Sequence, residues 1–150
     1  MPDARFRDAD GGALRLMAFD ADDLGVISAL VQDAVLSGAD MRWDAKGRRF
    51  DLLVNRFRWE NGTRAPERVR AVLTVDCVLG VSSDGIARGG DAVLSLLGIA
   101  FEHGEEPGGA LVLRFAGDGA IRLKVEAVEV RLSDVTRPYA APSGRVPRHD

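Results

Sequence analysis

The sequence predicts an α+β fold, with one N-terminal helix and about seven strands in a mostly antiparallel sheet or small sandwich. Two observations lead to this prediction. Helical periodicity is confined to one segment near the N-terminus, and after it the apolar residues recur at every second position. The length of 150 residues suits a single domain, and a hydrophobic content of 46% is enough for a core without a disulfide or metal. We expect a loose leader at 1–12, a globular domain at 13–136 and a mobile tail at 137–150.

The helix is predicted over residues 21–34. Apolar residues such as Leu24 and Ile27 recur there at helical spacing, and Asp20 is suited to the N-cap position. The short apolar stretch before it, at 14–19, predicts the first strand.

Alternation of apolar and polar residues predicts the remaining strands. In the segment 67–81 the alternation places Cys77 on the apolar face, which predicts a buried and inert thiol. The residues Ala-Gly-Asp-Gly at 116–119 predict a hairpin turn. The segment 127–135 fits either a helix or a strand. The other strands are expected at 49–60, 92–102, 110–115 and 120–125.

One short pattern occurs twice. Residues 57–62 and 99–104 both read apolar-x-aromatic-Glu-polar-Gly, and each is followed by a proline and an alternating strand. This pattern is typical of a hairpin with a polar loop. Two related β-hairpin units are one interpretation, and the chance resemblance of two hairpins is the other.

Basic residues gather in the middle of the chain. Residues 42–70 carry nine basic and four acidic groups, a net +5, whereas the whole chain carries −3. If 49–60 pairs with 67–81 so that Phe57 lies opposite Val69, one face of the hairpin end becomes rich in arginine. The arginines of this predicted face are Arg56, Arg58, Arg68 and Arg70.

Three uses of the arginine face stay open. The arginines could be solvated charges that keep a sheet edge from aggregating. They could pair with the acidic loop at 102–106, in the same molecule or in a second copy. They could also bind an external anion, since arginine binds phosphate and carboxylate through two parallel hydrogen bonds.

Catalytic and cofactor motifs find little support. The sequence has no Gly-x-Ser-x-Gly and no phosphate-binding glycine loop, and we expect no cofactor. The loop residues Glu102, His103, Glu105 and Glu106 are weak candidates for a metal site or for catalysis. A net charge of −3 makes nucleic acid an unlikely partner. Neither a signal peptide nor a membrane span is visible, so we expect a cytoplasmic protein.

Three separated segments resemble a known family. They are 24–34 (LGVISALVQDA), 55–60 (NRFRWE) and 115–134 (FAGDGAIRLKVEAVEVRLSD). They are similar, in the same order, to the uncharacterised bacterial proteins grouped as domain of unknown function 2948. The resemblance covers residues 14–135 and leaves out the leader and the tail. It implies a single-domain cytoplasmic protein and supplies no activity or catalytic residue.

The favoured hypothesis is therefore a non-catalytic binding or assembly module that uses the arginine face, with a protein partner or a second copy as its contact. The alternative is a small enzyme or metal-dependent protein that uses the loop 102–106. Whether the protein is an enzyme stays open at this point.

Overall fold

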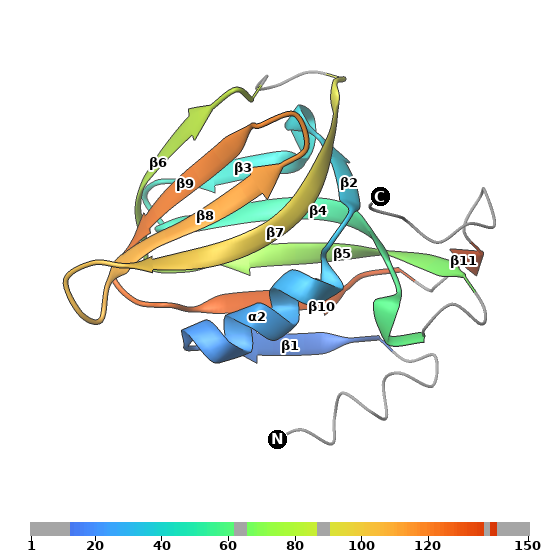
Figure 1. Ribbon diagram of the computed structural model, residues 1–150, viewed down its shortest axis with the longest axis horizontal. Coiled ribbons are helices and arrows are strands. Elements are labelled where there is room, and N and C mark those ends of the chain that lie inside the picture. The colour runs from blue at the N-terminus through green and yellow to red at the C-terminus, as the bar shows by residue number, and fades with distance from the viewer. Residues whose placement is uncertain (1–12, 62–65, 87–90, 137–138, 141–150) are drawn as a thin grey trace.

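The computed structural model describes residues 13–61, 66–86, 91–136 and 139–140; the predicted leader and most of the predicted tail lie outside these ranges. Within them the protein is mostly β: eleven strands form one antiparallel sheet, accompanied by one short α-helix (Figure 1). The prediction of about seven strands in an α+β arrangement or small sandwich was wrong. The short strands at 34–37, 41–44 and 139–140 were not predicted, and the predicted strand 67–81 consists of two separate strands.

Along the chain, one strand precedes the α-helix and the other strands follow it. The strands are β1 (Arg15–Ala18), β2 (Ala34–Ser37), β3 (Met41–Asp44), β4 (Arg49–Phe57), β5 (Glu67–Val75), β6 (Val78–Asp84), β7 (Val93–His103), β8 (Gly109–Phe115), β9 (Ala120–Val125), β10 (Val130–Asp134) and β11 (Tyr139–Ala140). The helices are α2 (Ala21–Leu30) and the short 3₁₀ turns η1 (Gly38–Asp40) and η2 (Trp59–Asn61).

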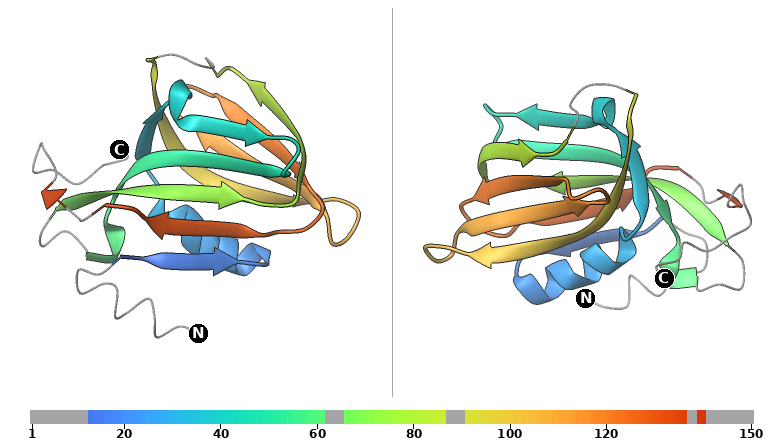
Figure 2. Two further views of the ribbon diagram at one scale, coloured as in Figure 1. Left: turned by 180° about the vertical axis from the view of Figure 1, so that it is seen from behind. Right: turned by 45° about the horizontal axis from the view of Figure 1, so that its top comes forward.

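The sheet curls so that its two halves face each other across one hydrophobic core (Figure 2). Its strand order is β1-β10-β5-β4-β2-β7-β8-β9-β6, while β3 pairs with β4 and β11 pairs with β5. Helix α2 packs against both β7 and β1, where it buries Leu24 and Ile27. The curled sheet is therefore an open barrel, and the helix covers one of its gaps.

The N-terminal end of α2 follows the local chemistry. The Asp20 carboxylate accepts a hydrogen bond from the Asp23 N–H at 2.8 Å, as predicted for an N-cap. The helix ends at Leu30, four residues before the predicted end. Asp33 adopts a positive φ of 64° and donates its N–H to the Leu96 carbonyl, and the chain continues into β2.

The predicted strand 67–81 breaks at residues 76–77. Cys77 has a φ of 61°, which is outside the range of a strand, and the chain turns there. Strand β5 pairs with β4 and β10, whereas β6 crosses over to pair with β9. The break inverts the alternation, so that Val78 is buried and Leu79 is exposed. Cys77 consequently lies half-buried in a turn, and its predicted place on a buried strand face was wrong.

Several hairpin predictions agree with the structure. Gly117 and Asp118 both have positive φ, at 84° and 68°, as a tight turn between β8 and β9 requires. The ambiguous segment 127–135 contains a strand, β10. The pairs β4–β5 and β7–β8 are both antiparallel hairpins. A common origin of these two hairpins stays a prediction.

Candidate functional site

The pairing of β4 with β5 differs from the predicted pairing by one residue. Phe57 lies opposite Arg68, and Arg56 lies opposite Val69. A shift by one residue moves a side chain to the other face of a sheet. Arg56 therefore points to the inner face with Val69, while Arg68 and Arg70 stay on the outer face. The predicted face of four arginines does not form.

Arg56 is fully buried, and carboxylates surround its guanidinium. Its Nε and Nη2 donate to the two oxygens of Asp134, each at 3.0 Å. Its Nη1 and Nη2 donate to the two oxygens of Glu60, at 2.9 and 2.7 Å. Asp134 Oδ2 also accepts the Leu14 N–H at 3.0 Å. This cluster joins β4, η2, β10 and the segment leading into β1.

Within this cluster, Arg56 and Glu60 each stabilise the charged form of the other. Burial by itself lowers the pKa of Arg56, but the hydrogen bonds and charges of Glu60 and Asp134 outweigh it and the pKa is raised. Burial raises the pKa of Glu60, and the hydrogen bonds and charge of Arg56 outweigh it in turn, so this pKa is lowered. Arg56 is thus held as a cation by its own chain and has no free face for an external anion.

Other residues of the segment NRFRWE also make contacts within the chain. Arg58 is buried and donates to Glu67 Oε1 at 2.6 Å. Trp59 donates its indole N–H to the Gln32 carbonyl at 2.9 Å and packs edge-on against Phe57. Arg68 and Arg70 lie on the outer face, where Arg68 donates to the Asn55 carbonyl and Arg70 is exposed. For these two, a role in anion or partner binding stays a prediction.

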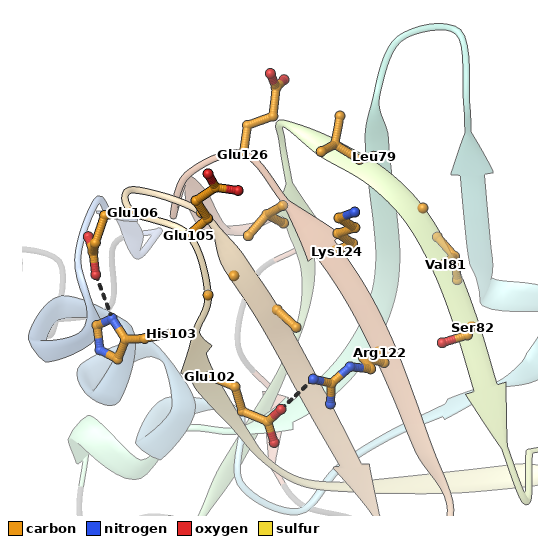
Figure 3. A pocket seen from close by; sticks show the side chains of 16 residues that line it. Leu79, Val81, Ser82, Glu102, His103, Glu105, Glu106, Arg122, Lys124 and Glu126 are labelled. Atoms are coloured by element: carbon orange, nitrogen blue, oxygen red, sulfur yellow. Dashed lines mark hydrogen bonds and ion pairs between the residues drawn. The ribbon is translucent and has the colours of Figure 1, made fainter.

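The loop 102–106 borders an open pocket of about 950 Å³ on the outer face of β6, β8 and β9 (Figure 3). Its candidate residues do not converge. Glu102 forms an ion pair with Arg122, whereas the exposed ring of His103 pairs with Glu106 at 3.1 Å and points away from Arg122 (Figure 3). Among the described residues, no group of three or more His, Cys, Asp and Glu side chains could hold a metal ion.

A second pocket, of about 270 Å³, lies between β3 and β6, and we call it the seam pocket. Strand β3 contributes Met41 and Trp43, and β6 contributes Val81 and Ser83. Phe50 and Ile121, both buried, also line it and belong to the core. The pocket thus opens the core to solvent between two strands.

Both strands beside the seam pocket are edges of the sheet. In the part of the chain that the structure describes, β3 pairs with β4 alone and β6 pairs with β9 alone. At one end the Val78 N–H donates to the Arg48 carbonyl at 2.9 Å, which holds β6 against the turn after β3. Beyond this bond no pairing joins the two strands over the described residues, and the seam pocket occupies the space between them.

Trp43 shows that the inner face is uncovered at this seam. It lies opposite Phe50 in the β3–β4 pairing and therefore shares its inner face, yet 37% of its surface is exposed. Sequence reasoning missed this site because β3 was not predicted. The available signal was the alternation of Met41 and Trp43 with Arg42 and Asp44.

Comparison with known proteins identifies a family. The sequence matches the profile of a family described as "Protein of unknown function (DUF2948)" over residues 14–149. This agrees with the resemblance seen in the sequence and extends it into the predicted tail. No curated protein and no solved structure matched. No helix of the described residues is long and apolar enough to cross a membrane.

Proposed function

The chain belongs to the DUF2948 family, and we propose that it is a non-catalytic binding module whose ligand places an apolar group in the seam pocket. Trp43 carries this proposal. An indole on the inner face of a sheet normally packs in the core, but here it borders a pocket that opens to solvent. A bound apolar group would cover it.

The composition of the pocket supports binding in preference to catalysis. None of its nine lining residues carries a titratable side chain, so the pocket offers no general acid or base. The lining is mostly apolar with one hydroxyl, that of Ser83, which is the usual character of a site that recognises shape and apolar surface. Two of the four arginines that suggested a charged contact surface, Arg56 and Arg58, are buried and form ion pairs with carboxylates of the same chain.

The size of the pocket limits the ligand. Its volume of about 270 Å³ lies just below the roughly 300–1,000 Å³ of typical ligand pockets, so it holds about one aromatic ring. Burying one aromatic side chain removes about 150–250 Å² from water. At about 25 cal/mol per Å² this contributes about 4–6 kcal/mol. Association costs about 4–15 kcal/mol, so a small molecule held by this pocket alone is expected to bind weakly.

The test uses Trp43 as a reporter. The chain has two tryptophans, so Trp59→Phe leaves Trp43 as the single indole. Titration with the dye 1-anilinonaphthalene-8-sulfonate should then quench the Trp43 emission and shift it to shorter wavelength. In this background Ser83→Leu fills the pocket and should abolish the response. Ser82→Leu places the same side chain on the outer face of β6 and should leave the response intact.

Two results would contradict the proposal. One is a dye response that Ser83→Leu and Ser82→Leu change equally, because the dye would then bind elsewhere. The other is a Trp43 emission that the dye does not affect although circular dichroism shows a folded protein.

A further inference from the structure

We propose that the occupant of the seam pocket is an extended segment of a partner protein, which adds a strand between β3 and β6. This inference rests on the proposed function of the pocket and names the class of its ligand. The partner segment carries one large apolar residue that enters the pocket and acidic residues beside it. Three features of the seam lead to this assignment.

The first feature is the pair of open strand edges. Each edge of a sheet presents backbone N–H and C=O groups that seek partners. Over the described ranges, β3 and β6 each use one side for pairing and leave the other side toward the seam. An extended segment between them can bond to both edges and complete the barrel, as in other strand-addition complexes.

The second feature is the spacing of the lining residues. Met41 and Trp43 stand two positions apart on β3, and Val81 and Ser83 stand two positions apart on β6. In a strand added between them, every second side chain would point inward onto this surface. The pocket accommodates one such side chain. Since the burial of one side chain does little more than offset the freedom lost on association, backbone hydrogen bonds must supply further affinity.

The third feature is the positive charge along the β3 rim of the seam. Arg42 on β3 and Lys46 in the following turn are exposed, and neither forms an ion pair with another residue of the described ranges. Their neighbours Arg48 and Arg49 already pair with Glu126 and Asp76. On the side of β3 the seam therefore favours acidic residues in the segment.

The experiment selects a displayed library of random twelve-residue peptides on the full-length protein, with the Ser83→Leu variant as the counter-selection. The enriched peptides should share one large apolar residue with acidic neighbours. N-methylation of alternate backbone amides in a selected peptide should weaken binding at least about tenfold, because it removes strand-pairing donors. The double charge reversal Arg42→Glu and Lys46→Glu should weaken binding at low salt, whereas Lys124→Glu, outside the seam, should not.

The outcomes separate this inference from the proposed function. If the dye responds to Ser83→Leu as expected but no peptide is enriched, or if N-methylation leaves the affinity unchanged, the strand-addition inference is overturned and the binding pocket stands. If Ser83→Leu changes neither the dye response nor the binding of the peptides, both proposals are refuted. Selected peptides that bind equally well to the charge-reversed and native proteins at low salt would refute the acidic partner.

Discussion

The buried arginine cluster gives the sharpest test of the structure, through the substitution Asp134→Ala. This change removes the acceptors of three hydrogen bonds, two from Arg56 and one from the Leu14 N–H. Arg56 keeps its two bonds to Glu60 but becomes a buried cation with one carboxylate instead of two. Removing one partner of a buried ion pair costs about 3–5 kcal/mol. We expect a loss of that size in the free energy of unfolding.

The measurement is urea denaturation followed by far-ultraviolet circular dichroism, with the free energy extrapolated to water. A loss of about 3–5 kcal/mol is a large part of the roughly 5–15 kcal/mol that holds a domain of this size together. The matched control is Glu126→Ala, which breaks the ion pair of Arg48 with Glu126. There 56% and 50% of the two side chains are exposed, so the loss should stay below about 1 kcal/mol.

A double-mutant cycle completes the test. Arg56→Met and Asp134→Leu should each be costly, but together they should cost less than the sum, by roughly 0.5–3 kcal/mol, because neither charge is then left without the other. The reasoning is refuted if Asp134→Ala costs no more than Glu126→Ala. Strict additivity of the two buried substitutions would refute the coupling.

Four further predictions follow from individual residues. The pKa of Glu60 is lowered on folding, because the bonds and charge of the buried arginine outweigh burial. The ionised Glu60 carboxylate therefore contributes its full stabilisation of the fold above its ordinary pKa of 4.5, and this stabilisation is lost as the pH falls below that value. The urea midpoint should consequently drop more steeply in acid for the native protein than for Glu60→Gln. Burial, together with nearby carboxylates, raises the pKa of Cys77, so iodoacetamide should alkylate it more slowly at pH 7.5 than it alkylates glutathione. Gly25→Ala should raise stability by about 0.5–1 kcal/mol, because the added methyl group meets nothing within 4 Å inside a helix. Gly109→Ala should lower stability by about 1–3 kcal/mol, because the methyl group would collide with a backbone carbonyl of β7; equal urea midpoints for the two alanine variants would contradict both expectations.

Elements set by neighbouring residues could be predicted from the sequence. The Asp20 cap depends on an N–H three residues away, and the turn after β8 depends on residues that tolerate positive φ. The strands β2 and β3 were missed because each has only four residues, so that its alternation, as at Met41 and Trp43 of β3, repeats only once and is a weak signal. The break at Cys77 was also invisible, because the alternation continues through it in the sequence while the backbone turns.

In the candidate site, too, the sequence could not predict features that depend on residues far apart in the chain. The sequence indicated that Arg56 lies beside aromatic residues, but its face depended on a register that a single residue inverts. Its partner Asp134 is 78 positions away, and no local pattern links the two. The seam pocket depends on two strands, β3 and β6, that are separated in the chain and pair with different neighbours.

The sequence by itself determined the family, the helix cap and the turns, because each depends on residue types read in order or on contacts within a few residues. Only the tertiary structure decided that the strands form one curled sheet, that the central arginines are neutralised inside it and that an apolar pocket stays open at its seam. These outcomes depend on which distant strands meet and in which register. That choice reflects the packing of the whole core, and alternating apolar residues are compatible with many such pairings.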